Sequence, residues 1–177
     1  MSLSDMVSLV IALCALAFTI GSFYWLYARI GTVRLAGAPR SFAFHQSEGR
    51  LVTTLPLALL NDGPTPIVLV NLRLRGRHPA FVADFIASHD EVYGDKGRAF
   101  ATAIVIPGND ARLVILEFQG VHPDSLSVGS KSLTLEGLEQ RLRGGARWRT
   151  LGEFALRIDE NILQQKERFL VYDNRPG

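Results

Sequence analysis

The stretch between Met6 and Ala28 contains no charged residue, and it constrains the fold of this chain more than any other feature. At about 1.5 Å of rise per residue, an α-helix over this stretch spans about 34 Å, and the hydrocarbon core of a bilayer is about 30 Å thick. Lipid offers no partner to an unpaired backbone group, so such a stretch crosses a membrane only as a helix. Aromatic residues gather at its end and Arg29 follows, which is typical of the headgroup boundary. We predict a transmembrane helix over residues 6–28, after a short tail over residues 1–5.

A cleaved secretory signal peptide is a poorer interpretation of this stretch. Signal peptides carry a positive region before a short apolar core, whereas Asp5 is the only charged residue ahead of this one. Ala15-Leu16-Ala17 resembles a cleavage site, but the apolar run continues well beyond it. We therefore expect an uncleaved anchor, with the lipid bilayer as the first predicted partner of the chain.

The charges on either side of the helix predict its orientation. Asp5 lies before it, while Arg29, Arg34 and Arg40 follow it closely. Lys and Arg near the end of a span stay on the cytoplasmic side. We expect a single-pass protein of the cell (inner) membrane with its N-terminus outside and its domain in the cytoplasm. An exported domain is the alternative.

The remainder of the chain has the size of one domain. Of the 177 residues, about 140 follow the predicted helix and its linker, enough for one hydrophobic core. The single cysteine, Cys14, lies in the predicted helix, which excludes disulfides and cysteine-based metal sites from the domain. Residues 29–39 are small and glycine-rich and are expected to form a juxtamembrane linker. We place the domain at residues 40–177.

Apolar and polar residues alternate with a period of two over most of this domain, which predicts short β-strands. The expected strands are residues 41–44, 51–60, 67–75, 81–87, 99–106, 112–119, 133–135, 148–158 and 168–172. Residues 136–143 fit either a helical turn or a continued strand, and residues 159–167 fit a short helix. Pro56 lies inside an expected strand and therefore predicts an edge position or a bulge.

The alternation also predicts which side chains face the core. In the strand 67–75, Val68, Val70, Leu72 and Leu74 are expected inside, with Arg73, Arg75 and Asn71 outside. Val114, Leu116 and Phe118 are expected inside in the strand 112–119, and Phe154, Leu156 and Ile158 in the strand 148–158.

Many short strands separated by turns favour an all-β, two-sheet sandwich. Residues 51–118 contain an Asn61-Asp62-Gly63 turn and a Pro107-Gly108 turn that is followed by an apolar strand. In these motifs the chain resembles the immunoglobulin-like sandwiches of small single-pass bacterial membrane proteins of unknown function. The resemblance implies an immunoglobulin-like β-sandwich architecture and no particular activity.

The sequence contains no recognisable catalytic or metal-binding motif. Its four histidines, at positions 45, 78, 89 and 122, lie in or beside polar turns, and no G-x-S-x-G motif is present. The acidic and histidine residues Asp84, His89, Asp90, Glu91 and Asp95 have a spacing that fits no metal-binding loop. We predict no enzymatic activity, cofactor, metal or small-molecule substrate.

One basic stretch suggests a contact with an anionic surface. It contains Arg141, Arg143, Arg147 and Arg149 around Trp148, and Arg73 and Arg75 are expected to extend it into one positive face. Anionic lipid is the natural partner for such a face beside a membrane. Nucleic acid is not expected, because the chain carries a net charge of only +2. The simpler alternative is that these arginines are outward positions of half-exposed strands, with Trp148 in the core.

These features favour a membrane-tethered, non-enzymatic binding or scaffolding module with an unknown protein partner, because sheet edges are common protein-binding surfaces. One alternative is an accessory subunit of a membrane or transport complex that contacts its partners through the transmembrane helix. A second is a domain that binds anionic lipid through the arginine-rich face.

Overall fold

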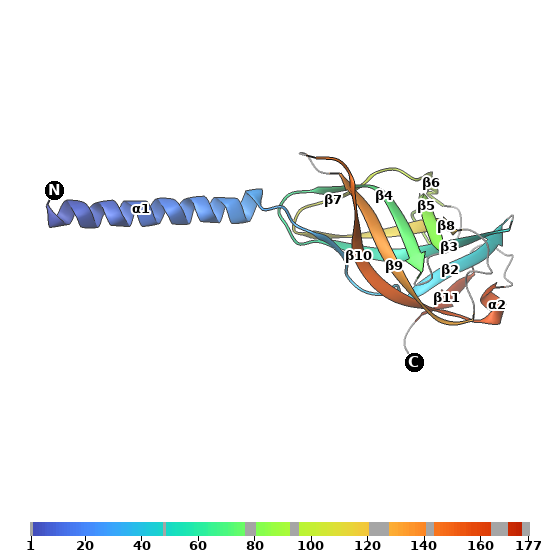
Figure 1. The fold of residues 1–177 in the computed structure, drawn as a ribbon. Helices are drawn as coiled ribbons and strands as arrows, with labels where there is room; N and C mark the ends of the chain where they lie inside the picture. The colour runs from blue at the N-terminus through green and yellow to red at the C-terminus, as the bar shows by residue number, and fades with distance from the viewer. Residues whose placement is uncertain are drawn as a thin grey trace.

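One long apolar helix and one mostly β domain make up the chain (Figure 1). The structure, a computed structural model, describes residues 2–47, 49–76, 81–92, 96–120, 128–140, 144–163 and 170–174. The expected mostly β domain with an N-terminal apolar helix is confirmed.

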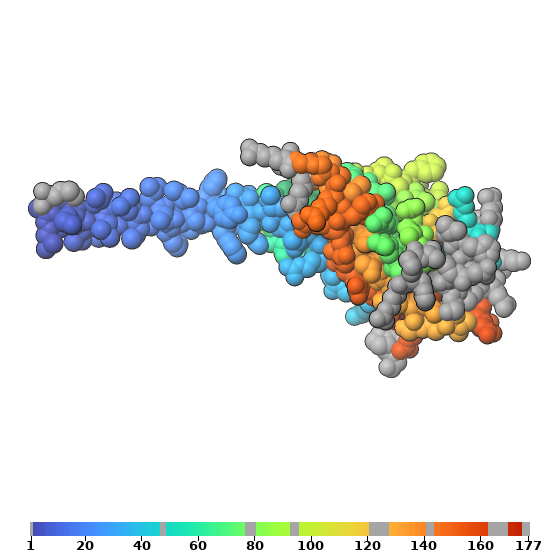
Figure 2. All heavy atoms as spheres, in the orientation of Figure 1, coloured from blue at the N-terminus to red at the C-terminus, as the bar shows by residue number. Residues whose placement is uncertain are grey.

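Helix α1 spans Leu3–Phe23 and continues into the π-helical turn Tyr24–Ala28. It begins before Met6 because Ser2 and Asp5 form a capping box: the Asp5 amide donates to the Ser2 hydroxyl (3.2 Å) and the Ser2 amide to the Asp5 carboxylate (2.8 Å). No residue of α1 is buried, and Figure 2 shows it clear of the domain. Together, α1 and the π-helical turn comprise 26 residues and form a helix that is long and apolar enough to cross a membrane.

The described strands form one antiparallel sheet with the order β10-β9-β4-β5-β8-β3-β2-β11, in which β1 pairs with β3, β6 with β5 and β7 with β4. The strands are β1 (Val33–Leu35), β2 (Ser41–Ser47), β3 (Arg50–Asn61), β4 (Ile67–Gly76), β5 (Val82–His89), β6 (Ala99–Phe100), β7 (Ile104–Ile106), β8 (Asp110–Gly120), β9 (Gly129–Gln140), β10 (Arg147–Ile158) and β11 (Val171–Asp173). A short helix, α2 (Glu160–Leu163), follows β10.

The sheet is curled, and one asparagine connects its two ends. Asn174 follows β11, and its side chain accepts the Arg157 amide (3.1 Å) and donates to the Ala155 carbonyl (2.9 Å), both on β10. The pairing therefore describes one curled antiparallel sheet, and it does not separate the strands into the two sheets of an immunoglobulin-like sandwich.

The core fills the inside of this curl. Its most deeply buried side chains come from strands on both halves of the sheet: Leu55, Leu57, Leu59, Leu72, Leu74, Leu116, Phe118, Leu135 and Leu156. The expected inward positions of Leu116 and Phe118 on β8, and of Phe154, Leu156 and Ile158 on β10, are confirmed.

The inward face expected for β4 is wrong in the first half of the strand. Ile67 and Leu69 are buried there, whereas Val70 is 38% exposed. The cause is a β-bulge, because the register against β9 shifts between Leu69 and Asn71. One extra residue exchanges the two faces of a strand.

Pro56 lies at a local edge, as expected. Strand β3 pairs with β8 on one side along its length. On its other side the pairing with β2 ends at Thr54 and the pairing with β1 starts at Leu59. Pro56 occupies the gap between these two strands, where the missing backbone N–H costs no ladder hydrogen bond.

The segment expected to be a linker contains a strand. β1 pairs with the end of β3, and Val33 is 3% exposed within the core. The sheet domain therefore starts directly after the helix rather than at residue 40. Strand β9 reaches Gln140, so the undecided segment is strand as far as that residue, and α2 lies within the expected short helix.

Candidate functional site at the helix end of the sheet

Asp62 holds the segment that leaves α1 against the sheet domain. It lies in the turn between β3 and β4, and its carboxylate accepts the Thr32 amide (2.7 Å) and the Thr32 hydroxyl (3.1 Å). Arg34 on β1 forms a salt bridge with the same carboxylate, and Arg29 donates to the Asp62 carbonyl. The Thr32 amide and then Arg34 lower the pKa of Asp62 below its ordinary value of 3.8.

Asn61, fully buried beside Asp62, connects two turns. Its side-chain amide donates to the carbonyls of Thr65 (2.8 Å) and Pro107 (3.0 Å), and its side-chain oxygen accepts the Gly63 amide (3.1 Å). The β3–β4 turn and the β7–β8 turn are therefore fixed to each other at the end of the sheet where α1 arrives.

Two glycines allow the backbones to meet at this junction. A Cβ added at Gly31 would lie 2.2 Å from the Gly63 amide nitrogen, and one at Gly63 would lie 2.2 Å from the Gly31 backbone. Only glycine fits such a close approach. The junction is therefore a packed, hydrogen-bonded contact, and Arg29 extends it toward the helix by stacking over Trp25, 4.6 Å from the ring centre.

The structure places Arg73 and Arg75 on the outward face of β4. Both pair with Glu136 on β9, at 2.6 and 3.4 Å, and Arg73 stacks over Trp148, 4.0 Å from its ring centre. Trp148 is half-buried on this outward face rather than in the core. Glu136 partly compensates the charge of these two arginines.

Arg147 and Arg149 lie on the opposite face of the sheet. Arg147 pairs in register with Glu139 and Arg149 with Gly137, and these β9 positions alternate with the outward Glu136 and Leu138. Arg149 forms a salt bridge with the buried Glu139 (3.2 Å).

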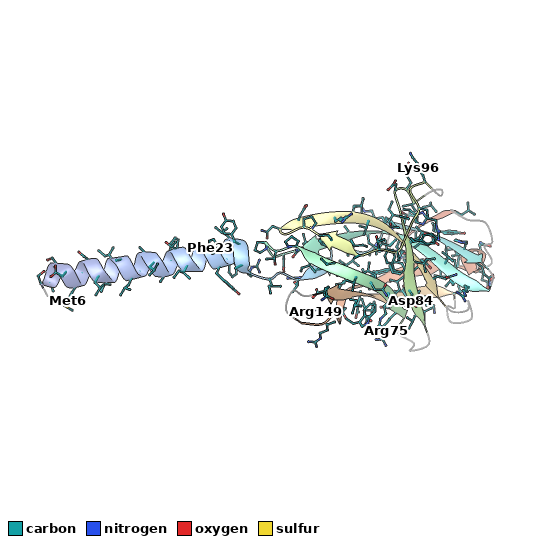
Figure 3. All side chains as sticks on the ribbon, turned by 90° about the horizontal axis from the view of Figure 1, so that it is seen from above. Met6, Phe23, Arg75, Asp84, Lys96 and Arg149 are labelled. Atoms are coloured by element: carbon teal, nitrogen blue, oxygen red, sulfur yellow. The ribbon has the colours of Figure 1, made fainter. Side chains whose placement is uncertain are left out.

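Of the six predicted arginines, Arg141 and Arg143 lie outside the described residues. The four described ones lie on two different faces of the sheet. Figure 3 shows Arg149 nearer to α1 than Arg75. The two described groups thus differ both in face and in distance from the helix.

Two further arginines at the helix end were not predicted as part of this surface. Arg34 pairs in register with Leu60, and Arg112 with Leu59, both just before Asn61. Arg112 is exposed and donates to the Val105 carbonyl (2.6 Å). No local signal in the sequence places either of them at the same end of the sheet as Arg147, because that placement depends on strand pairing across the domain.

A second polar cluster lies between β5 and β8. Nε2 of His89 is 2.6 Å from a carboxylate oxygen of Glu117, and Arg98 donates to both Glu117 oxygens (3.2 and 3.3 Å). Burial raises the pKa of Glu117, but the hydrogen bonds from Arg98 and His89 outweigh it, so the pKa lies below its ordinary value of 4.5. The ionised carboxylate requires the His89 proton on Nε2.

This cluster connects β5 and β8 and has a structural role. The His89 side chain has no solvent exposure, and its Nδ1 has no hydrogen-bond partner among the described residues. An enclosed imidazole of this kind has no access to a substrate. Within the described part of the chain no three His, Cys, Asp or Glu side chains gather in a metal-binding arrangement, and Asp95 lies outside it.

Comparisons with known proteins give no family. No family model matches the chain, and no curated protein matches it. A crystal structure of a protein from Archaeoglobus fulgidus is similar over 74% of this chain and 98% of its own, with 9% sequence identity and a TM-score of 0.41. A similarity of this extent establishes neither a shared fold nor a shared function.

Proposed function

We propose that this protein is a membrane-tethered, non-enzymatic binding or scaffolding module. The observation that carries the proposal is the junction around Asp62, where hydrogen bonds fix the exit of an entirely exposed apolar helix to the sheet domain. A helix with this much exposed apolar surface needs a lipid or protein environment. A domain fixed to it presents its surfaces at a constant height above the bilayer, which suits a platform for a partner protein.

The finer parts of the proposal have separate support. The charges that flank α1 support an inner-membrane protein with its N-terminus outside and its domain in the cytoplasm. The core shared by both halves of the curled sheet supports an immunoglobulin-like sandwich, as in the small bacterial membrane proteins that the sequence resembles. The enclosure of His89 supports a module without catalysis.

Membrane insertion is tested first, by alkaline carbonate extraction of the full chain from cell membranes. The protein should stay in the pellet, as integral proteins do. Release into the supernatant would rule out the tether.

The two modes of partner binding are then separated by photo-crosslinking in mild detergent. A photoreactive residue at Phe100, which is 79% exposed on β6, reports on the sheet domain, and one at Ile11 in α1 reports on the helix. The proposed module should give discrete adducts from Phe100. Adducts from Ile11 alone would instead favour the alternative, an accessory subunit held through its transmembrane helix.

A further inference from the structure

Four described arginines gather at the helix end of the sheet, and we call them the arginine rim: Arg34, Arg112, Arg147 and Arg149. Arg34 and Arg112 lie beside the end of β3, which enters the Asp62 turn. Arg147 and Arg149 lie at the start of β10 and pair with the end of β9. The end of β9 in turn pairs with the start of β4, on the other side of that turn. The rim therefore surrounds the point where α1 meets the domain.

Carboxylates balance only part of the rim. Asp62 pairs with Arg34, and Glu139 pairs with Arg149. Arg112 and Arg147 are exposed and have no carboxylate partner among the described residues, although Asp110 lies near Arg112 in sequence. The rim therefore presents a net positive charge.

The length of the helix and the packed junction set the height of the rim. The 26 residues of Leu3–Ala28 span about 39 Å, whereas a bilayer with its headgroups is about 40–45 Å thick. A helix of this length ends within the headgroup layer. Because Gly31 already contacts Gly63 of the domain, the rim follows directly at the level of the lipid phosphates.

The surroundings of the rim suit this interface. Ile30 and Leu113, which adjoin it, are 64% and 72% exposed apolar side chains. The aromatic residues Tyr24, Trp25 and Tyr27 lie just before it, as is common at the headgroup boundary. Arginine is the side chain best suited to phosphate, because its planar fork donates two hydrogen bonds at once.

We propose that the arginine rim binds the phosphates of anionic phospholipids in the bilayer that α1 crosses, and that this contact holds the helix end of the domain against the membrane surface. The inference rests on the proposed function, because it requires α1 to be inserted. It differs from the single arginine-rich face expected from the sequence: Arg73 and Arg75 are excluded, and Arg34 and Arg112 are included.

The test uses the full chain in nanodiscs, with Cys14→Ser and one new cysteine that carries a fluorescent probe. The cysteine replaces Ala146, which is exposed directly before Arg147, or Ala155, which is exposed farther along β10 as a reference site. Quenching by a headgroup nitroxide lipid is measured in phosphatidylcholine alone and in phosphatidylcholine with phosphatidylglycerol. The probe at 146 should be quenched more strongly with phosphatidylglycerol, and the probe at 155 should not change.

Two double variants with the same loss of charge make the test specific. Arg112→Gln/Arg147→Gln removes half of the rim, whereas Arg50→Gln/Arg157→Gln removes two exposed arginines at the far end of the sheet. Each arginine near an anionic surface changes the docked population by about fivefold, so the rim variant should reduce the effect of phosphatidylglycerol by more than an order of magnitude. The far-end variant should leave it unchanged.

Equal quenching in both lipids, or an equal loss in both double variants, would overturn the inference. Protection of the probe at 146 by single-stranded RNA, without any effect of phosphatidylglycerol, would assign the rim to nucleic acid instead. If carbonate releases the chain from membranes, the proposed function fails first. If the chain stays in the membrane but quenching of the probe at 146 does not depend on the lipid charge, only the rim inference fails.

Discussion

Asn61 looks like an ordinary turn residue in the sequence, yet in the structure it is a fully buried link between two turns. Asn61→Ala would leave the Thr65 and Pro107 carbonyls and the Gly63 amide without their partner. We expect the free energy of unfolding to fall by about 3 kcal/mol. Asn71→Ala is the control, because the half-buried Asn71 side chain bonds only the Leu72 amide among the described residues, so its loss should cost less than about 1 kcal/mol. Urea denaturation followed by Trp148 fluorescence in a Trp25→Phe background measures both.

Glu117 should make the stability of the domain depend on pH. Its pKa is lower in the folded protein than its ordinary value of 4.5, so its ionisation stabilises the fold above that value. This contribution is lost as the pH falls from 4.5 through the folded pKa. Glu117→Gln should flatten the slope of stability against pH in this range and lower the stability at neutral pH by about 2 kcal/mol.

The exposed Glu153 of β10 provides the control for this slope. Glu153→Gln should keep the wild-type dependence, and Asp62, whose pKa is also lowered, should leave a residual slope in Glu117→Gln. Denaturation series at several acidic pH values test the expectation. Parallel curves for wild type and Glu117→Gln would show that Arg98 and His89 do not lower the pKa of Glu117 in the folded protein.

At the level of elements, the segment between α1 and β2 contains two glycines that differ in the space around them. A Cβ at Gly31 would overlap Gly63, whereas a Cβ at Gly37 would meet nothing within 4 Å. Gly31→Ala should therefore loosen the junction and destabilise the domain by about 2 kcal/mol, while Gly37→Ala should be neutral. Spin labels on Cys14 and on a cysteine at Ala155 report the change as a broader distance distribution. Equally narrow distributions in both variants would mean that the junction does not fix the helix.

Asn174 connects the two end strands of the sheet, because it follows β11 and its side chain bonds the backbone of β10. Asn174→Ala removes the acceptor of the Arg157 amide and the donor to the Ala155 and Pro39 carbonyls. We expect a loss of about 2 kcal/mol and faster hydrogen exchange of the Arg157 amide. Asn161→Ala, at an exposed position in α2, is the matched control and should change neither. An unchanged Arg157 exchange rate in Asn174→Ala would show that the curl is closed by other contacts.

At the scale of the whole molecule, sequence reasoning succeeded where the signal is local. The uncharged run predicted the apolar helix, and the alternation in residues 112–119 predicted the buried Leu116 and Phe118. It failed where the outcome depends on register. The bulge beside Val70 exchanged the faces of β4, and strand pairing separated Arg73 from Arg147. Neither a bulge nor a partner strand is encoded in the pattern of a single segment.

The candidate site was predictable only in its residue types. The arginines around Trp148 are visible in the sequence, but the surface they belong to is formed by β1, β8 and β10, which are distant in the chain. The Asn61-Asp62-Gly63 turn was recognised as a turn, whereas its role as the anchor of the helix exit depends on contacts with Gly31, Thr32 and Arg34. Long-range contacts of this kind leave no trace in local spacing.

The orientation of the whole molecule would decide which leaflet supplies the lipid for the proposed contact with the arginine rim. A cysteine for accessibility labelling does not fit at Gly108, because a Cβ there would lie 1.8 Å from the Pro64 carbonyl oxygen, so we place it at the exposed Thr102 in a Cys14→Ser background. Because Asp5 lies in the first turn of α1 and Arg29, Arg34 and Arg40 follow the helix, we expect the cysteine at 102 to react with an impermeant maleimide only after the cells are permeabilised.

A cysteine at Ser4 should show the opposite behaviour and react in intact cells, which controls for the reactivity of the reagent. Labelling at 102 but not at Ser4 in intact cells would place the domain outside. The flanking charges would then not determine the topology, and the rim would face the outer leaflet of the same bilayer. Because Asp62 fixes the rim beside the helix exit in either case, the proposed contact between its arginines and anionic headgroups would keep its geometry, and only the leaflet that supplies the lipid would change.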